Sequence, residues 1–220
     1  MSRARRVTAW GVLCGLSAMT SPLQAEVAWK TFDATPYFIE PTECDRLAAH
    51  PDDPFRLAPG VPTSVMDRPA AIRACRAELS RFADNPRLAY QLARALTYDG
   101  RISEALPLLE QAAATGYPQA LFVLGYLYLE GAYRAPLNPC RAAELIRSAA
   151  LSGRLAALLG YPAYVLSGRF AACSLQENDE ELQAFIVKAR EQRLEYYPAV
   201  LAESLSRQLE QRAGAVTPRE

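Results

Sequence analysis

A short pattern of small residues occurs twice in the middle of the chain, and it limits the possible folds more than any other feature of the sequence. Glycine, alanine and glycine recur in the same order 37 positions later, at Gly116, Ala120 and Gly131, then at Gly153, Ala157 and Gly168. A fixed period of this length is typical of arrays of helix pairs, in which each pair buries its apolar faces only against its neighbours. The sequence therefore predicts stacked pairs of helices.

Helical periodicity runs from Asp67 to residue 213. Apolar residues recur every three or four positions, as at Ile72, Cys75 and Leu79, and no stretch alternates with period two for long enough to predict a strand. We expect helical repeats over residues 86–116, 117–153 and 154–193, a preceding helix from Asp67, a capping helix over 197–212 and a disordered tail over 214–220. The predicted fold class is all-α: a short α-solenoid of antiparallel helix pairs.

The central repeat has a recognisable residue pattern. In order along the chain it contains Ala120, Leu124-Gly125, Tyr128, Gly131, Ala142-Ala143, Ala149-Ala150 and Gly153. This pattern resembles the Sel1-like repeat, and residues 86–116 resemble the shorter tetratricopeptide form. Residues 157–192 match less well, because Pro162 stands where the central repeat has Gly125. We therefore expect the third helix pair to be distorted.

The resemblance implies a protein that binds a peptide or helix of a partner on the concave face of the solenoid. That face is formed by the first helix of each pair. The side chains that would lie on it are Tyr90, Arg94, Tyr98, Phe122, Tyr126 and Glu130. Aromatic and arginine side chains at four-residue spacing suit a peptide groove. In the alternative interpretation, the same side chains pack against neighbouring helices or against the preceding segment.

That preceding segment, residues 26–66, is rich in proline and lacks sustained periodicity. Its prolines are Pro36, Pro41, Pro51, Pro54, Pro59 and Pro62. We expect an irregular lead-in with one short helical turn between Cys44 and Ala48. Its aromatic residues, Trp29, Phe32, Tyr37 and Phe38, are expected to hold it against the helical domain.

Residues 1–25 have the layout of a secretory signal peptide. Arginines at positions 3, 5 and 6 precede an apolar stretch of about 13 residues, and Ala25 ends a run of small and helix-breaking residues. The stretch is too short for a membrane span, which needs roughly 20 residues. Lipidation at Cys14 is disfavoured because the bulky Leu13 precedes it. We expect cleavage after Ala25, a periplasmic or secreted protein, and no membrane insertion after cleavage.

Four cysteines remain after residue 25, and an even number in an exported chain favours disulfide bonds. Three pairings are possible; we favour Cys44–Cys75 and Cys140–Cys173, the second on condition that Cys173 lies in a loop over residues 168–178.

The sequence has no C-x-x-C pair and a single histidine, His50. We therefore expect neither a metal site nor a cofactor.

Charge and motif content argue against nucleic-acid binding and against catalysis. After residue 25 the chain has 21 Lys and Arg against 24 Asp and Glu, whereas phosphate binding needs a surplus of basic residues. The S-x-x-K motif of serine β-lactamases needs a serine three positions before a lysine. The only lysines are Lys30 and Lys188, and the residues three positions before them are Val27 and Phe185, so the motif is absent. No G-x-S-x-G motif or glycine-rich phosphate loop occurs. We expect a non-enzymatic protein.

Two functions remain at the level of the sequence. The first is a scaffold, adaptor or regulator in the bacterial cell envelope that holds a partner protein, for example the periplasmic domain of a membrane protein. The alternative is a module that associates with cell-wall or polysaccharide material and assists an envelope enzyme.

Overall fold

The structure is a computed structural model, and it describes residues 27–175 and 178–216. The predicted signal peptide over residues 1–25 and the last four residues of the predicted tail lie outside the described residues. All regular elements in the described part are helices, which confirms the all-α class. None of these helices is both long and apolar enough to cross a membrane.

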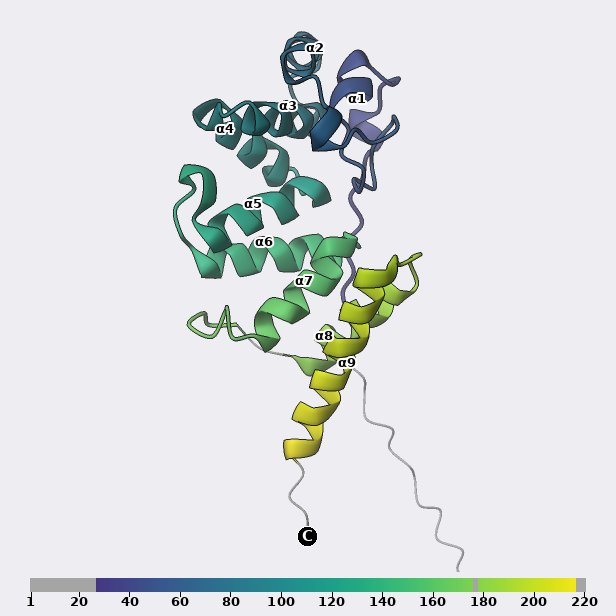
Figure 1. Ribbon diagram of the computed structural model, residues 1–220, viewed down its shortest axis with the longest axis vertical. Coiled ribbons are helices and arrows are strands. Elements are labelled where there is room, and N and C mark those ends of the chain that lie inside the picture. Colours follow the sequence, from purple (N-terminus) through teal and green to yellow (C-terminus); the bar gives the residue numbers. More distant parts are fainter. Residues whose placement is uncertain (1–26, 176–177, 217–220) are drawn as a thin grey trace, which may run out of the picture.

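Helices follow one another in chain order and each packs against the next (Figure 1). Their bounds are α1 Glu43–Ala48, α2 Arg68–Arg81, α3 Pro86–Tyr98, α4 Ile102–Ala114, α5 Pro118–Glu130, α6 Pro139–Leu151, α7 Leu155–Leu166, α8 Asp179–Arg190 and α9 Tyr196–Val216. Short 3-10 turns occur at Thr35–Tyr37, Thr63–Val65 and Ala132–Arg134. Figure 1 shows the helices stacked from α2 at one end to α8 and α9 at the other.

The helix ends lie where the local sequence favours them. Before α3, the side chain of Asn85 accepts a hydrogen bond of 3.2 Å from the backbone N–H of Leu88, and Pro86 occupies the first helical position. After α4, Gly116 has a φ of +84°, the left-handed conformation in which a glycine commonly ends a helix, and it is the residue at which the first predicted repeat ends. These signals fix the turns between helices and so set which helices become neighbours.

Helices α5 and α6 approach closely because α5 carries a glycine at their contact. A Cβ atom at Gly125 would lie 2.6 Å from Ile146 Cγ1 and 3.2 Å from the carbonyl oxygen of Ala142. No other residue type leaves enough room for the two helices at this point. The small residue of the central repeat therefore has a direct packing role.

Two boundaries differ from the sequence-based expectation. Helix α7 is a single helix from Leu155 to Leu166 with the buried Pro162 inside it, so the proline does not interrupt the third pair. Packing of α7 against α6 and α8 compensates for the missing backbone hydrogen bond. Helix α9 continues past Arg212 to Val216.

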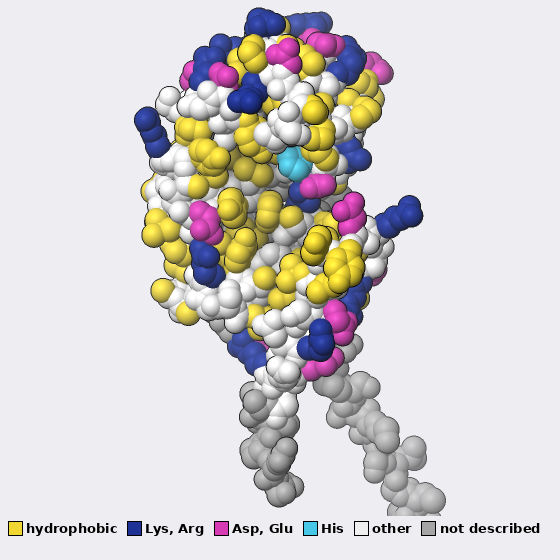
Figure 2. Space-filling view, viewed as in Figure 1, with side chains coloured by type: hydrophobic (Ala, Val, Ile, Leu, Met, Phe, Trp, Pro, Cys, Tyr) yellow, Lys and Arg dark blue, Asp and Glu magenta, His cyan; other side chains and the backbone are white. Residues whose placement is uncertain are grey.

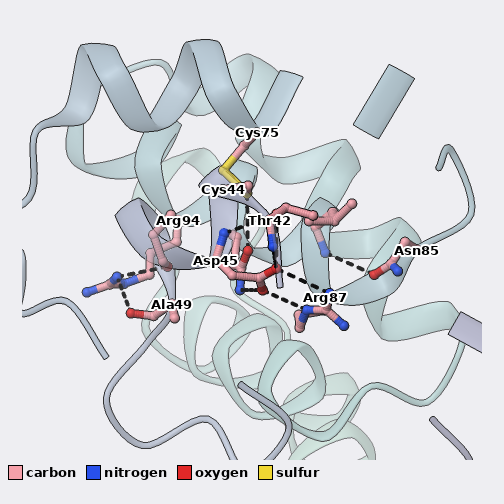
Figure 3. The surroundings of a disulfide bond; sticks show 11 residues. Thr42, Cys44, Asp45, Ala49, Cys75, Asn85, Arg87 and Arg94 are labelled. Atoms are coloured by element: carbon pink, nitrogen blue, oxygen red, sulfur yellow. Dashed lines mark hydrogen bonds and ion pairs between the residues drawn. A yellow bond between two sulfur atoms is a disulfide. The ribbon is translucent and has the colours of Figure 1, made fainter. Parts of the chain in front are cut away.

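Both favoured disulfide pairings are present. Cys44 on α1 bonds to Cys75 on α2 with a Cα–Cα distance of 4.5 Å (Figure 3). Cys140, in the first turn of α6, bonds to Cys173 with a Cα–Cα distance of 5.2 Å. Cys173 lies between α7 and α8, outside both helices, which confirms the condition set for this pairing.

The lead-in lies along the stacked helices instead of extending away from them (Figure 1). The backbone N–H of Lys30 donates to the carbonyl oxygen of Leu151 at the end of α6, at 2.9 Å. The ring of Trp29 packs edge-on against Phe185 of α8 at 5.7 Å. Further along, Phe32 packs against Tyr117, just before α5, at 5.4 Å. Trp29 and Phe32 thus anchor the segment, whereas Phe38, which was expected to do the same, is 66% exposed.

Candidate functional site

The structure divides the six predicted partner-binding residues into a covered set and an accessible set. The six are Tyr90, Arg94 and Tyr98 on α3, and Phe122, Tyr126 and Glu130 on α5. Tyr90 and Arg94 are only 2% and 6% exposed. Tyr98 and Tyr126 are 36% and 44% exposed, Glu130 is exposed, and Phe122 is partly buried. Among the described residues, the second set therefore keeps some surface open to solvent.

Arg94 is covered because it holds the lead-in against α3 (Figure 3). Its Nη1 donates to the carbonyl oxygens of Ala48 and Ala49, both at 3.1 Å, and its Nη2 donates to that of Val61 at 2.7 Å. The guanidinium carbon also lies 5.6 Å from the centre of the Tyr98 ring. The lead-in therefore occupies the part of the face that α3 would otherwise offer to a partner.

A set of five buried polar side chains joins the lead-in to α3, α5 and the start of α7. Tyr117 donates its hydroxyl to Asp53 Oδ2 at 2.6 Å. Gln119 donates through Nε2 to the hydroxyl oxygen of Tyr90 at 3.0 Å, and its Oε1 accepts a hydrogen bond from Arg154 Nε. All five side chains are almost completely buried. Buried polar groups of this kind need hydrogen-bond partners, and here they find them in one another.

Burial shifts the pKa values of Asp53 and Tyr117, two of these five side chains. Burial raises the pKa of Asp53, against hydrogen bonds from the Tyr117 hydroxyl and the backbone N–H of Phe55. Burial also raises the pKa of Tyr117 well above its usual value, and the charge of Asp53 raises it further. Tyr117 therefore stays the proton donor in this pair. Asp53 is 0% exposed, so it has no surface with which to contact a substrate, and its role in this structure is to hold the lead-in.

His50 lies beside this group at the edge of the lead-in. Burial and the nearby positive charge of Arg94 lower the pKa of His50 to about 4. It is therefore neutral at neutral pH, and its Nδ1 accepts a hydrogen bond of 3.0 Å from the backbone N–H of Asp52. In residues 27–175 and 178–216, no three His, Cys, Asp or Glu residues are grouped in a way that could hold a metal ion.

Accessible aromatic side chains continue from α5 to α7, and we call Phe122, Tyr126, Gly160 and Tyr164 the aromatic strip. A Cβ atom at Gly160 would lie 3.6 Å from the ring of Phe122 and 3.5 Å from that of Tyr164, so the glycine lies beside both rings. Burial raises the pKa of Tyr164, and the neighbouring Tyr126 raises it further. The four residues thus form one continuous apolar surface.

The space-filling view places this surface in context. Figure 2 shows hydrophobic side chains gathered around a hollow in the middle of the molecule, with the single histidine beside it. On one side of the strip, the buried Arg154 stacks over Phe122 with its guanidinium carbon 5.6 Å from the ring centre. On another, Glu130 forms a 2.9 Å ion pair with Arg169. The strip is therefore apolar in its centre and charged where it ends.

Sequence reasoning missed the part of the strip that lies on α7. The 37-residue period of the small residues relates Phe122 and Tyr126 to Leu159 and Ala163, whereas the residues of α7 that lie next to Phe122 and Tyr126 are the half-buried Gly160 and Tyr164, each one position later. A search for four-residue spacing within α7 itself would have found Gly160 and Tyr164. Arg154 was missed for another reason: its position just before a helix gave no sign that it would be buried.

Comparisons with protein-family models, with curated proteins and with solved structures found no match. The candidate surface is therefore defined by geometry and chemistry alone. It consists of an aromatic strip on α5 and α7, next to a lead-in that fills the corresponding part of α3. Its exposed groups can stack on or pack against a ligand. The buried acid, Asp53, is held away from solvent.

Proposed function

We propose that this chain is an exported, non-enzymatic scaffold or adaptor of the bacterial cell envelope. Its helix pairs are proposed to be Sel1-like and tetratricopeptide-like repeats in a short α-solenoid, and its partner is proposed to be a protein segment bound on the aromatic strip. Three features support this proposal: helices that pack in chain order, the glycine contact between α5 and α6, and two disulfide bonds. Disulfides of this kind persist in oxidising compartments.

The observation that carries the proposal is the accessibility of the strip. The lead-in covers Arg94, and Tyr117 and Gln119 pack on Tyr90, yet Tyr126 on α5 remains 44% exposed. An accessible tyrosine next to two partly buried aromatic rings offers a surface on which an apolar side chain of a partner can pack. Aromatic residues in such surroundings contribute much of the binding energy at protein interfaces.

Crosslinking in intact cells tests this proposal. A photoreactive phenylalanine analogue in place of Tyr126 should crosslink to one dominant protein, identified by mass spectrometry. The same analogue in place of Glu144, whose side chain is 61% exposed on α6, serves as the control. In the presence of Tyr164→Ala, the Tyr126 crosslink should fall at least about fivefold, because the partner loses one wall of its contact.

Two outcomes would overturn the proposal. Identical crosslinks from positions 126 and 144 would mean that the strip has no special role. Retention of the purified protein on cell-wall polysaccharide, with loss of retention in Tyr126→Ala and no protein crosslink, would favour the glycan-associated alternative. Circular dichroism and a thiol count confirm that each variant is folded and oxidised.

A further inference from the structure

A second surface lies at the opposite end of the helix stack from α2. A groove of about 870 Å³ runs between α8 and α9 and reaches the first described residues of the lead-in. Its lining residues are Val27, Trp29, Asp179, Glu180, Gln183, Ala184, Val187, Leu209, Glu210 and Ala213. None of them belongs to the aromatic strip, so the groove is a separate feature of the molecule.

The floor of the groove is apolar and accessible. Trp29 is 42% exposed and Val187 is 46% exposed, although both are large hydrophobic residues. Trp29 is also held in place, because its ring packs edge-on against the fully buried Phe185 at 5.7 Å. Rigid, exposed apolar side chains at the bottom of a depression are typical of interaction surfaces.

The rim of the groove is acidic. Asp179 and Glu180 lie at the start of α8 and Glu210 lies on α9. In the part of the chain that the structure describes, the cation beside the floor is Lys188, whose ammonium lies 6.0 Å from the centre of the Trp29 ring and is paired with Glu191 at 2.7 Å. Asp179 has a partner in Arg212 at 3.4 Å. Within the described residues, neither Glu180 nor Glu210 makes an ion pair, and both are exposed. The groove therefore presents two carboxylates that are free to meet positive charges on an incoming segment.

The shape of the groove suits a helix. Its two long walls are themselves helices, and each carries a small residue towards the groove, Ala184 on α8 and Ala213 on α9. Small residues let a further helix approach closely enough to pack its side chains between those of the walls. Within the described residues, α9 packs against α8 and α7.

We propose that this groove binds an amphipathic helix of a partner protein, with apolar side chains facing Trp29 and Val187 and with lysine or arginine side chains facing Glu180 and Glu210. The apolar floor supplies most of the affinity. The acidic rim selects basic partners and rejects acidic ones. This site acts independently of the aromatic strip, so the protein holds two different segments at once.

Fluorescence provides a direct test, because the chain has only two tryptophans, Trp10 and Trp29. In the full chain with Trp10→Phe, Trp29 is the single reporter. The probe is a 14-residue peptide of leucine and lysine at helical spacing. We expect a saturable shift of Trp29 emission to shorter wavelength as the peptide removes water from the ring, and no such shift with a peptide that has glutamate in place of lysine.

Matched variants separate this site from non-specific attraction. The double change Glu180→Lys and Glu210→Lys should weaken peptide binding by about tenfold. The same charge reversals at Glu40 and Glu195, which are exposed outside the groove, should weaken it by less than about twofold. Ala184→Leu should abolish the fluorescence shift by keeping the peptide helix from approaching α8 closely, without changing the helical circular dichroism spectrum.

Three results would overturn the proposal: equal binding of the basic and acidic peptides, equal effects of the groove and control reversals, or a dimer of the peptide-free chain that Ala184→Leu dissociates. The last would make a second copy of the chain the occupant of the groove. Tyr126→Ala, which tests the aromatic strip, should leave the Trp29 shift unchanged, so the two proposals fail or stand separately.

Discussion

Arg87 on α3 and Asp45 on α1 form an ion pair inside the protein, with Nε and Oδ1 2.7 Å apart and both side chains nearly inaccessible to solvent (Figure 3). Gln91 adds a hydrogen bond of 2.9 Å to the same oxygen. Burial alone would raise the pKa of Asp45, but the hydrogen bonds from Arg87, Thr42 and Gln91 outweigh it and hold the pKa below its usual value. Asp45 therefore stays ionised, and its charge depends on these donors.

Removing one partner of this pair should strongly destabilise the fold. Arg87→Ala leaves an ionised carboxylate buried without its countercharge, and we expect a loss of about 3–5 kcal/mol in the free energy of unfolding. Arg46→Ala removes an exposed ion pair with Glu43 on the same short helix, and should cost less than about 1 kcal/mol. Urea denaturation measures both. Similar small losses for the two variants would contradict a structural role for the buried pair.

The pKa of His50 gives a prediction about pH. The folded-state pKa is about 4, below the ordinary 6.5, so the unfolded chain binds a proton between these values and the folded chain does not. Stability should therefore fall as the pH decreases from 6.5 towards 4, by an amount on the order of 1 kcal/mol after allowance for partial exposure.

NMR can measure the pKa of His50 directly, because the chain contains one histidine and its resonances need no further assignment. Its NMR signals should titrate near pH 4. His50→Asn keeps an acceptor for the backbone N–H of Asp52 but does not titrate, so the loss of stability between pH 6.5 and 4 should be smaller in this variant. A midpoint near 6.5 in the folded protein would show that His50 is not shielded by the lead-in.

Two glycines on the first helices of neighbouring pairs should respond differently to the same substitution. Gly125→Ala places a methyl group 2.6 Å from Ile146 Cγ1, and we expect it to cost about 1–3 kcal/mol by overpacking. Gly160→Ala brings only contacts of 3.5 and 3.6 Å and replaces glycine within a helix, so it should be neutral or stabilising by up to about 1 kcal/mol. Thermal unfolding compares the two; equal effects would mean that α5 and α6 do not meet at Gly125.

The two disulfide bonds should differ in their resistance to reduction. Cys44 and Cys75 are each 0% exposed, whereas Cys140 is exposed and Cys173 partly so. A reductant reaches an exposed sulfur first. Under mild reduction, alkylation and peptide mass spectrometry should find Cys140 and Cys173 modified before the other pair.

Loss of the bond between Cys140 and Cys173 should lower the free energy of unfolding by about 3–4 kcal/mol, since this bond closes a loop of 33 residues.

The sequence was most informative where a local rule decides the outcome. Asn85-Pro86 predicted the start of α3, and Gly116 predicted the end of α4, because capping depends on a few adjacent residues. The disulfide pairing followed from sequence separation and from the loop around Cys173. Pro162 was judged by its local effect alone, and the packing on both sides of α7 proved stronger than that effect.

The candidate surfaces were harder to predict because the exposure of a helix residue depends on which distant segment of the chain packs over it. Tyr90 and Arg94 have the spacing expected of exposed residues, but a segment some 30–45 positions earlier supplies the carbonyl groups that Arg94 binds. Nothing in the spacing of α3 contains that information. The groove between α8 and α9 likewise needs Trp29, which is remote from both helices in the sequence, to complete its floor.

The course of the lead-in has a consequence for how the molecule unfolds. An array whose helices pack mainly on their neighbours can lose its end helices one at a time, since each contact is local. Here one segment is bound to α3 through Arg94, to the end of α6 through Lys30 and to α8 through Trp29. Neither end can melt without breaking contacts of this shared segment. The lead-in therefore couples distant helices into a single cooperative transition.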